Sequence, residues 1–104
     1  MSLSDFSLSG KKALVIGARR NMGKAFALGL AEAGADVAIT DVNLESGQLK
    51  QVAEDIKAMV RESMVIQTDI SKKNEVQDLI ESVTDNFGTI DILMNVAVMY
   101  HHKS

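Results

Sequence analysis

Four short apolar runs alternate along this chain with three longer stretches in which apolar residues recur every three or four positions. The apolar runs are residues 12–17, 35–40, 63–68 and 90–98, and the periodic stretches are 21–33, 44–61 and 71–87. A continuous apolar run is typical of a strand buried on both faces of a sheet, and the wider spacing is typical of a helix with one apolar face. The order β-α-β-α-β-α-β predicts a parallel sheet with helical crossovers, which is a Rossmann-like half of a doubly wound α/β fold.

Glycines and one serine set the expected helix boundaries. Gly34 and Gly88 are placed to end the first and third helices, and Ser71 is placed to cap the amino end of the third. The first helix is expected to turn one face toward the sheet, formed by Met22, Ala25, Phe26, Gly29, Leu30 and Ala33.

The length of 104 residues allows one domain, which we expect to span residues 1–98 and to be followed by a tail at 99–104. The net charge of −3 argues against a nucleic-acid partner, because neutralising phosphates requires an excess of Lys and Arg. There is no cysteine, so disulfides and thiolate metal sites are excluded. No apolar run reaches the roughly 20 residues of a membrane span, and no secretory signal is evident. We therefore expect a cytoplasmic protein without a membrane partner.

The stretch from Ala13 to Asp41 carries the strongest functional pattern. Gly17 ends the first expected strand and Gly23 lies in the first turn of the following helix. Such a junction can direct backbone N–H groups and the positive end of a helix dipole at a pyrophosphate, and a Cβ would hold that phosphate away. The alternative interpretation is a tight turn with close packing of the helix on the strand.

An acid follows at the end of the second expected strand. Asp41 is placed where a carboxylate accepts hydrogen bonds from a ribose diol, and the same charge would repel a 2′-phosphate. The residue therefore favours NAD over NADP, whereas Arg20 in the glycine turn favours NADP weakly.

These features resemble the short-chain dehydrogenase/reductase family along essentially the whole chain. The family's T-G-x-x-x-G-x-G turn reads Ile16 to Gly23 here, Asp69-Ile70-Ser71 matches the element after the third strand, and the segment 91–98 matches the strand that normally ends N-N-A-G. The resemblance implies a set of cofactor-binding residues: Gly17, Arg20, Asn21, Met22, Gly23, Asp41, Asp69, Ile70, Asn95 and Ala97. It places Asp69 against the adenine ring. A turn role for Asp69 and a structural, sheet-bridging role for Asn95 remain open.

The chain departs from the family pattern at several positions. Asn21 replaces the middle glycine of the turn, Ile16 replaces its threonine, and Val98 replaces the last glycine of N-N-A-G. The family's catalytic Ser and Tyr-x-x-x-Lys pair follow the fourth strand, but Ser104 stands where that lysine would follow Tyr100. We therefore predict no catalytic residue in this chain. We also predict no metal site, since the adjacent His101 and His102 point apart.

Three functional hypotheses follow. The first is the amino-terminal, dinucleotide-binding portion of an NAD(P)-dependent oxidoreductase, truncated before its catalytic residues and without turnover alone. The second is a standalone NAD-binding or sensing module. The third is an oligomerisation element that forms a homodimer or a larger homo-oligomer through the open edge of the fourth strand or an exposed sheet face.

Overall fold

The computed structural model describes residues 7–18, 21–42 and 47–96, and these residues form the predicted α/β fold. The elements follow in the predicted order: β1 (Lys12–Ile16), α1 (Asn21–Glu32), β2 (Asp36–Asp41), α2 (Gln48–Ala58), β3 (Ser63–Gln67), α3 (Lys73–Phe87) and β4 (Ile92–Asn95). The Rossmann-like alternation is therefore confirmed.

The strands form one parallel sheet in the order β3-β2-β1-β4. The central strand β1 pairs on one side with β2 and on the other with β4, so that Val15 lies opposite both Ile39 and Met94. After β3 the chain crosses back over the sheet to place β4 beside β1. In open α/β sheets, ligands bind outside the carboxyl ends of the strands at such a reversal of strand order.

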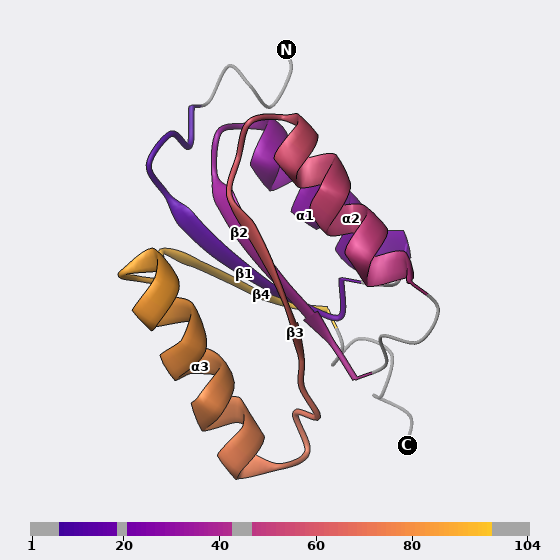
Figure 1. The fold of residues 1–104 in the computed structure, drawn as a ribbon, viewed down its shortest axis with the longest axis vertical. Helices are drawn as coiled ribbons and strands as arrows, with labels where there is room; N and C mark the ends of the chain where they lie inside the picture. The colour runs from indigo at the N-terminus through magenta and orange to yellow at the C-terminus, as the bar shows by residue number, and fades with distance from the viewer. Residues whose placement is uncertain (1–6, 19–20, 43–46, 97–104) are drawn as a thin grey trace.

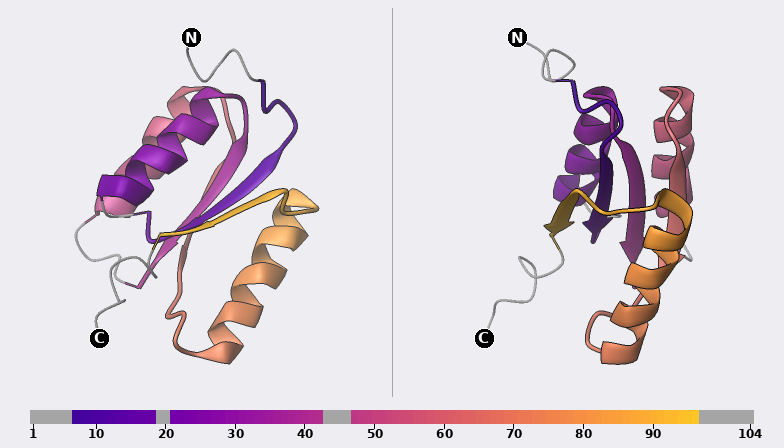
Figure 2. Two further views of the ribbon diagram at one scale, coloured as in Figure 1. Left: turned by 180° about the vertical axis from the view of Figure 1, so that it is seen from behind. Right: turned by 90° about the vertical axis from the view of Figure 1, so that its left-hand side faces the viewer.

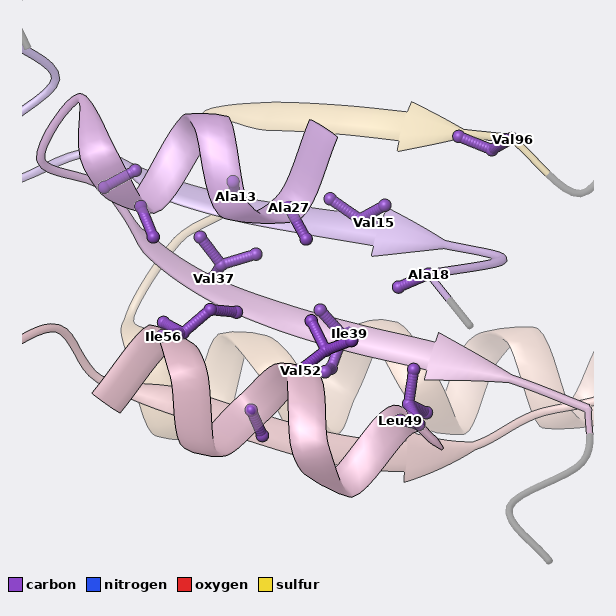
Figure 3. Packing of buried hydrophobic residues seen from close by; sticks show 13 residues of the cluster. Ala13, Val15, Ala18, Ala27, Val37, Ile39, Leu49, Val52, Ile56 and Val96 are labelled. Atoms are coloured by element: carbon purple, nitrogen blue, oxygen red, sulfur yellow. The ribbon is translucent and has the colours of Figure 1, made fainter. Parts of the chain in front are cut away.

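Helices cover both faces of the sheet. Figures 1 and 2 show α1 and α2 side by side on one face and α3 on the other. The larger core lies under α1 and α2, and Figure 3 shows Ile39 of β2 beside Val52 of α2 and Val15 of β1 nearer to Ala27 of α1. The smaller core joins Leu14 of β1 to Leu79 and Val83 of α3. β1 and β2 are buried on both faces, and accordingly their residues 13–16 and 37–39 are continuously apolar.

The predicted inward face of α1 is wrong in the first turns of the helix, although Leu30 of that face packs against the larger core. The buried residues of this helix are Gly23, Ala27 and Ala31, which recur every fourth position, whereas Met22 is 42% exposed and Phe26 is 39% exposed. Small side chains let the helix axis lie close to β1 and β2, and a Met and a Phe on the same stripe would hold the helix off. Three-to-four spacing alone does not distinguish the bulky stripe from the small one.

The predicted cap of α3 is also wrong. The N-cap residue is Lys72, which makes no side-chain capping bond, and the helix begins at Lys73. The Ser71 hydroxyl instead donates to Asp69 Oδ1 at 2.6 Å. This local side-chain hydrogen bond uses the hydroxyl that was expected to cap the helix.

Gly88 ends α3 as predicted, with φ of 87° and its N–H donated to the Thr84 carbonyl. The predicted helix from residue 44 begins at Gln48, and residues 43–46 lie outside the described part of the chain.

Hydrogen bonds of charged side chains stabilise the edge of the sheet at which the strands begin. Lys12 Nζ lies 2.5 Å from Asp36 Oδ2, and the Asp36 Oδ1 atom accepts the Glu62 N–H at 2.8 Å. The hydrogen bond to Asp36 raises the pKa of Lys12. Burial tends to raise the pKa of Asp36, but the hydrogen bonds from Lys12 and Glu62 outweigh it and lower that pKa. This cluster joins the starts of β1 and β2 to the turn before β3.

Val60 gives a first testable prediction. Its φ of 62° is in the left-handed region, which disfavours a β-branched residue, and its side chain is 87% exposed and so contributes little packing. We expect Val60→Gly to raise the free energy of unfolding by about 1 kcal/mol, measured by urea denaturation. The matched control is Ala58→Gly, within the right-handed helix α2, which should lower that free energy by about the same amount. If Val60→Gly lowered the free energy of unfolding as Ala58→Gly does, the backbone strain at Val60 would be contradicted.

Candidate functional site

The carboxyl ends of the four strands bring most of the predicted site residues to one edge of the sheet. Because all strands are parallel, the residues that follow β1, β2, β3 and β4 lie along this edge (Figure 1). These residues are Gly17 after β1, Asp41 at the end of β2, Asp69 after β3, and Asn95 at the end of β4. Residues 21–23 join them at the start of α1. Arg20 and Ala97 lie outside the described residues, as does Val98.

The two glycines are in direct contact with each other. Gly17 has a φ of 88°, a conformation that favours glycine. A Cβ built on Gly23 would lie 2.1 Å from the Gly17 carbonyl oxygen and 2.9 Å from the Ala18 Cα. Both neighbours are backbone atoms, which cannot move aside as the end of a flexible side chain can. Gly23 is therefore required for close packing of the helix on the turn, which is the alternative interpretation given in the sequence analysis. This holds whether or not the glycine also lets a ligand approach the backbone.

Two N–H groups of the turn are engaged within the protein. Gly17 and Ala18 both donate to the Thr40 carbonyl of β2, at 2.8 and 3.2 Å. The first residues of an α-helix have no intrahelical acceptor for their N–H groups, and the helix dipole places positive charge at the same point. Among the residues of this turn that the structure describes, the donors that remain for an anion are those at the start of α1, where Asn21 and Met22 are exposed and Gly23 is buried.

Hydrogen bonds with the backbone of neighbouring residues hold Asp41 at the end of β2. The residue is only 8% exposed, and its Oδ1 atom accepts the Val42 N–H at 2.8 Å. Its carbonyl accepts the Thr68 N–H at 3.0 Å, which ties the end of β2 to the segment after β3. Each carboxylate oxygen can accept more than one hydrogen bond, so these contacts are compatible with a ribose hydroxyl as a further donor.

A hollow of about 380 Å³ opens beside Asp69 at this edge. Its volume falls within the roughly 300–1,000 Å³ typical of small-molecule sites. It is lined by the residue after β2, the end of β3, the segment that joins β3 to α3, and the first turn of α3: Val42, Gln67, Asp69, Lys72 and Glu75. The Gln67 side chain donates to the Val42 carbonyl at 2.9 Å and so connects two walls of the hollow.

The Asp69 carboxylate is fixed by its neighbour Ser71. Asp69 Oδ1 accepts the Ser71 hydroxyl at 2.6 Å and the Ser71 N–H at 3.0 Å. These hydrogen bonds, the hydroxyl first, hold the pKa of Asp69 below its usual value. The residue between them, Ile70, turns toward the smaller core and packs against the cluster that contains Leu14 and Leu79.

Asn95 is exposed at the end of β4, opposite Ile16. The next residue donates its backbone N–H to the Ile16 carbonyl at 2.9 Å, which keeps the chain beside β1 past the end of the strand. Within residues 7–18, 21–42 and 47–96, no side-chain hydrogen bond of Asn95 is seen, so a sheet-bridging role has no support there.

Sequence reasoning missed four of the residues that line the hollow. Val42, Gln67, Lys72 and Glu75 carry no motif, and they meet only because β2, β3 and α3 converge. One signal was available for Glu75, since an acid in the first turn of a helix commonly bonds a backbone N–H nearby. Glu75 does so, because its Oε1 accepts the Asp69 N–H at 2.9 Å.

Comparison with known proteins decides the family. The family model described as short chain dehydrogenase matches residues 11–104. The chain belongs to the short-chain dehydrogenase family. Among curated proteins it is 39% identical over 97 residues to 15-hydroxyprostaglandin dehydrogenase [NAD(+)] of Macaca fascicularis, covering 93% of this chain and 36% of that protein. It is 42% identical over 95 residues to 2-dehydro-3-deoxy-D-gluconate 5-dehydrogenase of Pseudoalteromonas atlantica, covering 91% of this chain and 37% of that protein.

Solved structures of the short-chain dehydrogenase family agree with the fold. A structure from Burkholderia phymatum in complex with NAD is 31% identical, with a TM-score of 0.76 over 85% of this chain and 31% of that one. A metagenomic short-chain oxidoreductase in complex with NADP is 32% identical, with a TM-score of 0.76 over 83% of this chain and 38% of that one. The family therefore binds NAD(P), and these comparisons do not choose between the two cofactors.

The chain spans just over a third of the length of the curated relatives that it matches. As a member of an oxidoreductase family that matches over residues 11–104, it is better described as the amino-terminal portion of such a protein than as an unrelated sensing or oligomerisation module. Among the residues that the structure describes, no helix is both long and apolar enough to cross a membrane.

The contact between the glycines makes a second prediction. We expect Gly23→Ala to lower the free energy of unfolding by roughly 2–4 kcal/mol, because the new methyl group overlaps a backbone carbonyl. The measurement is urea denaturation followed by circular dichroism. Gly47→Ala is the matched control, since a Cβ at Gly47 meets no atom within 4 Å and adds only the strain of a φ of 75°, about 1 kcal/mol. If the two variants lose the same free energy of unfolding, the overlap of the Gly23→Ala methyl group with the Gly17 carbonyl does not destabilise the fold as expected.

Proposed function

We propose that this chain is the dinucleotide-binding portion of an NAD-dependent oxidoreductase. The observation that carries the proposal is Asp41, buried at the end of β2 on the same edge as the Gly17–Gly23 contact. A glycine turn into a helix suits a pyrophosphate, and an acid one strand away suits a ribose diol. The hollow lined by Asp69 and by Val42, the residue after Asp41, supports a position for the base at the same edge.

The residues proposed to hold the cofactor come from three places along this edge. The start of α1 supplies N–H groups to the pyrophosphate, Asp41 accepts from the ribose, and the segment after β3 meets the adenine. The remaining proposed contacts are Arg20, Met22, Ile70, Asn95 and Ala97. When bound, the dinucleotide supplies the hydride acceptor or donor of the reaction, and the protein supplies binding and orientation.

We propose that NAD is preferred to NADP and that the chain alone has no turnover. The Asp41 carboxylate, held in a largely buried position, would lie close to a 2′-phosphate and repel it. The family's catalytic Ser and Tyr-x-x-x-Lys have no counterpart in this sequence. The absence of cysteine is consistent with the cytoplasm as the site of action.

Cofactor titration gives the third prediction. Purified chain titrated with NADH and with NADPH, followed by fluorescence and calorimetry, should bind NADH more tightly by about tenfold or more. In Asp41→Asn most of that preference should disappear, because the amide removes the charge that repels the 2′-phosphate. Asp85→Asn carries the same change of charge in the last turns of α3, on an exposed position, and should keep the preference.

The outcomes separate the parts of this proposal. A folded wild-type chain that binds neither dinucleotide would refute dinucleotide binding. Equal affinity for NADH and NADPH in the wild type would refute the role of Asp41 alone. Any reduction of a panel of carbonyl compounds by the purified chain with NADH would contradict the absence of turnover.

A second proposal concerns self-association, and a specific observation on β4 favours it. In the part of the chain that the structure describes, β4 pairs on one side only, with β1. Leu93 on this strand is 58% exposed. An unpaired strand edge with an exposed Leu is a template for pairing with another chain. We propose that the chain forms a homodimer or larger homo-oligomer through this edge or the adjoining sheet face.

The fourth prediction tests that edge. Light scattering at high micromolar concentration should give a mass at least twice that of the 11.2 kDa chain. Leu93→Lys should shift the species toward monomer, because an edge lysine opposes strand pairing. Lys50→Leu, which adds a leucine at an exposed position of α2 away from the strand edge, is the control and should leave the mass unchanged. A monomeric wild type would refute the proposal.

A further inference from the structure

Methionine is the only sulfur-bearing residue type in this chain, which contains six methionines and no cysteine. Among the methionines that the structure describes, Met59 and Met94 are partly buried and pack against the larger core, and Met64 packs against the smaller core. Met22 is 42% exposed. Since oxidation of sulfur depends on access, an oxidant in solution reaches Met22 before the other three, and no thiol competes for it.

The exposed side chain of Met22 is separate from the packing of α1. This helix packs on the sheet through the small residues Gly23 and Ala27, whereas Phe26, one turn after Met22, is 39% exposed. A polar group on the Met22 side chain therefore enters neither core. A polar group on a methionine that is packed against a core would be unfavourable without a hydrogen-bond partner. Oxidation of Met22 is thus compatible with an intact fold.

Met22 also lies where α1 offers hydrogen-bond donors to an anion. It is the second residue of the helix, so its own N–H has no acceptor within the helix. Gly17 and Ala18 donate to the Thr40 carbonyl, so the described donors of the glycine turn that remain are those in the first turn of α1. A thioether sulfur is only a weak acceptor and competes little for these donors. A sulfoxide oxygen is a polar acceptor on the same side chain.

We propose that Met22 is a reversible oxidation site and that its sulfoxide weakens the binding of a dinucleotide at the start of α1. The regulatory part of this inference rests on the dinucleotide site proposed above. The new oxygen accepts N–H groups that would otherwise bind the pyrophosphate, and its partial negative charge lies close to that anion.

The oxidant is hydrogen peroxide or another peroxide. The O–O bond of the peroxide breaks, one oxygen atom forms a bond with the Met22 sulfur, and the other leaves as water or an alcohol, so that sulfur is oxidised and the peroxide is reduced. In the reverse step a methionine sulfoxide reductase removes the oxygen as water, and two thiol groups supplied with the reductase are oxidised to a disulfide.

Peptide mapping tests the modification site. The purified chain is treated with increasing hydrogen peroxide and then digested with trypsin, which cleaves after Lys and Arg. Met22 and Met59 are released in separate short peptides, residues 21–24 and residues 58–61, and no other methionine shares either peptide. The gain of one oxygen atom should be at least about fivefold faster in peptide 21–24 than in peptide 58–61. Equal rates, or a faster gain in peptide 58–61, would overturn the modification site.

Calorimetric titration with NADH tests the regulation. The wild type is titrated before peroxide, after enough peroxide to oxidise peptide 21–24 alone, and after treatment with sulfoxide reductases for both sulfoxide epimers. The oxidised chain should bind NADH roughly fivefold more weakly, as expected for the loss of one hydrogen bond to a charged group, and reduction should restore the affinity. The midpoint of urea denaturation should not change with oxidation.

Two variants assign the effect to one residue. Met22→Leu has a side chain of similar volume that peroxide does not oxidise, and Met59→Leu is the matched control. Each variant is compared with itself before and after peroxide, so a changed starting affinity does not enter the comparison. Peroxide should leave the NADH affinity of Met22→Leu unchanged and should lower that of Met59→Leu as it does in the wild type.

The outcomes separate this inference from the proposed function. A loss of affinity in the wild type and in Met59→Leu, but not in Met22→Leu, supports the inference. An affinity unchanged by oxidation of Met22, an equal loss in Met22→Leu, a loss with a lower urea midpoint, or a loss that the reductases do not reverse overturns the regulation and leaves the proposed function intact. A folded wild type that binds no NADH before peroxide refutes the regulation and the proposed function together, and the peptide map still decides the oxidation site.

Discussion

The approach of Gly23 to the Gly17 carbonyl sets the geometry on which the rest of this fold depends. A Cβ at that point would lie 2.1 Å from a backbone oxygen, so the start of α1 can lie on the turn after β1 only because the side chain is absent. The same closeness continues along the helix through Ala27 and Ala31. A helix that lies this near the sheet places its first N–H groups and its dipole at the carboxyl edge of the strands.

The carbonyl of Thr40 extends that constraint to the neighbouring strand. It accepts the N–H groups of both Gly17 and Ala18, which fixes the glycine turn to the residue that directly precedes Asp41. Asp41 and the glycine turn are therefore held in a fixed position relative to each other. The buried Thr40 hydroxyl, donated to the Ile66 carbonyl, and the bond from the Thr68 N–H to the Asp41 carbonyl then attach the end of β3 to the same unit. The ends of three strands are held together by backbone acceptors, which gives the candidate site a rigid base.

The carboxyl edge offers N–H donors at the start of α1, the largely buried acid Asp41 and the acid Asp69, which Ser71 orients. The relatives that it resembles bear names with unrelated substrates, a hydroxyprostaglandin and a ketogluconate, at similar identity. Likeness in this portion therefore does not indicate a substrate, since function depends on the site rather than on the fold alone.

The sequence by itself determined the order of elements, the parallel sheet and the family, because burial on both faces makes strands continuously apolar and the glycine turn needs residues without side chains. It also identified Gly17, Gly23, Asp41 and Asp69 as residues of one edge. Only the tertiary structure decided which stripe of α1 faces the sheet, since Met22 and Phe26 recur with the same period as Gly23 and Ala27. It alone showed that Ser71 bonds Asp69 instead of capping α3, and that Val42, Gln67, Lys72 and Glu75 share a hollow. Periodicity is a local property, whereas the distance between a helix and a sheet, and the meeting of three segments at one point, depend on contacts between residues far apart in the chain.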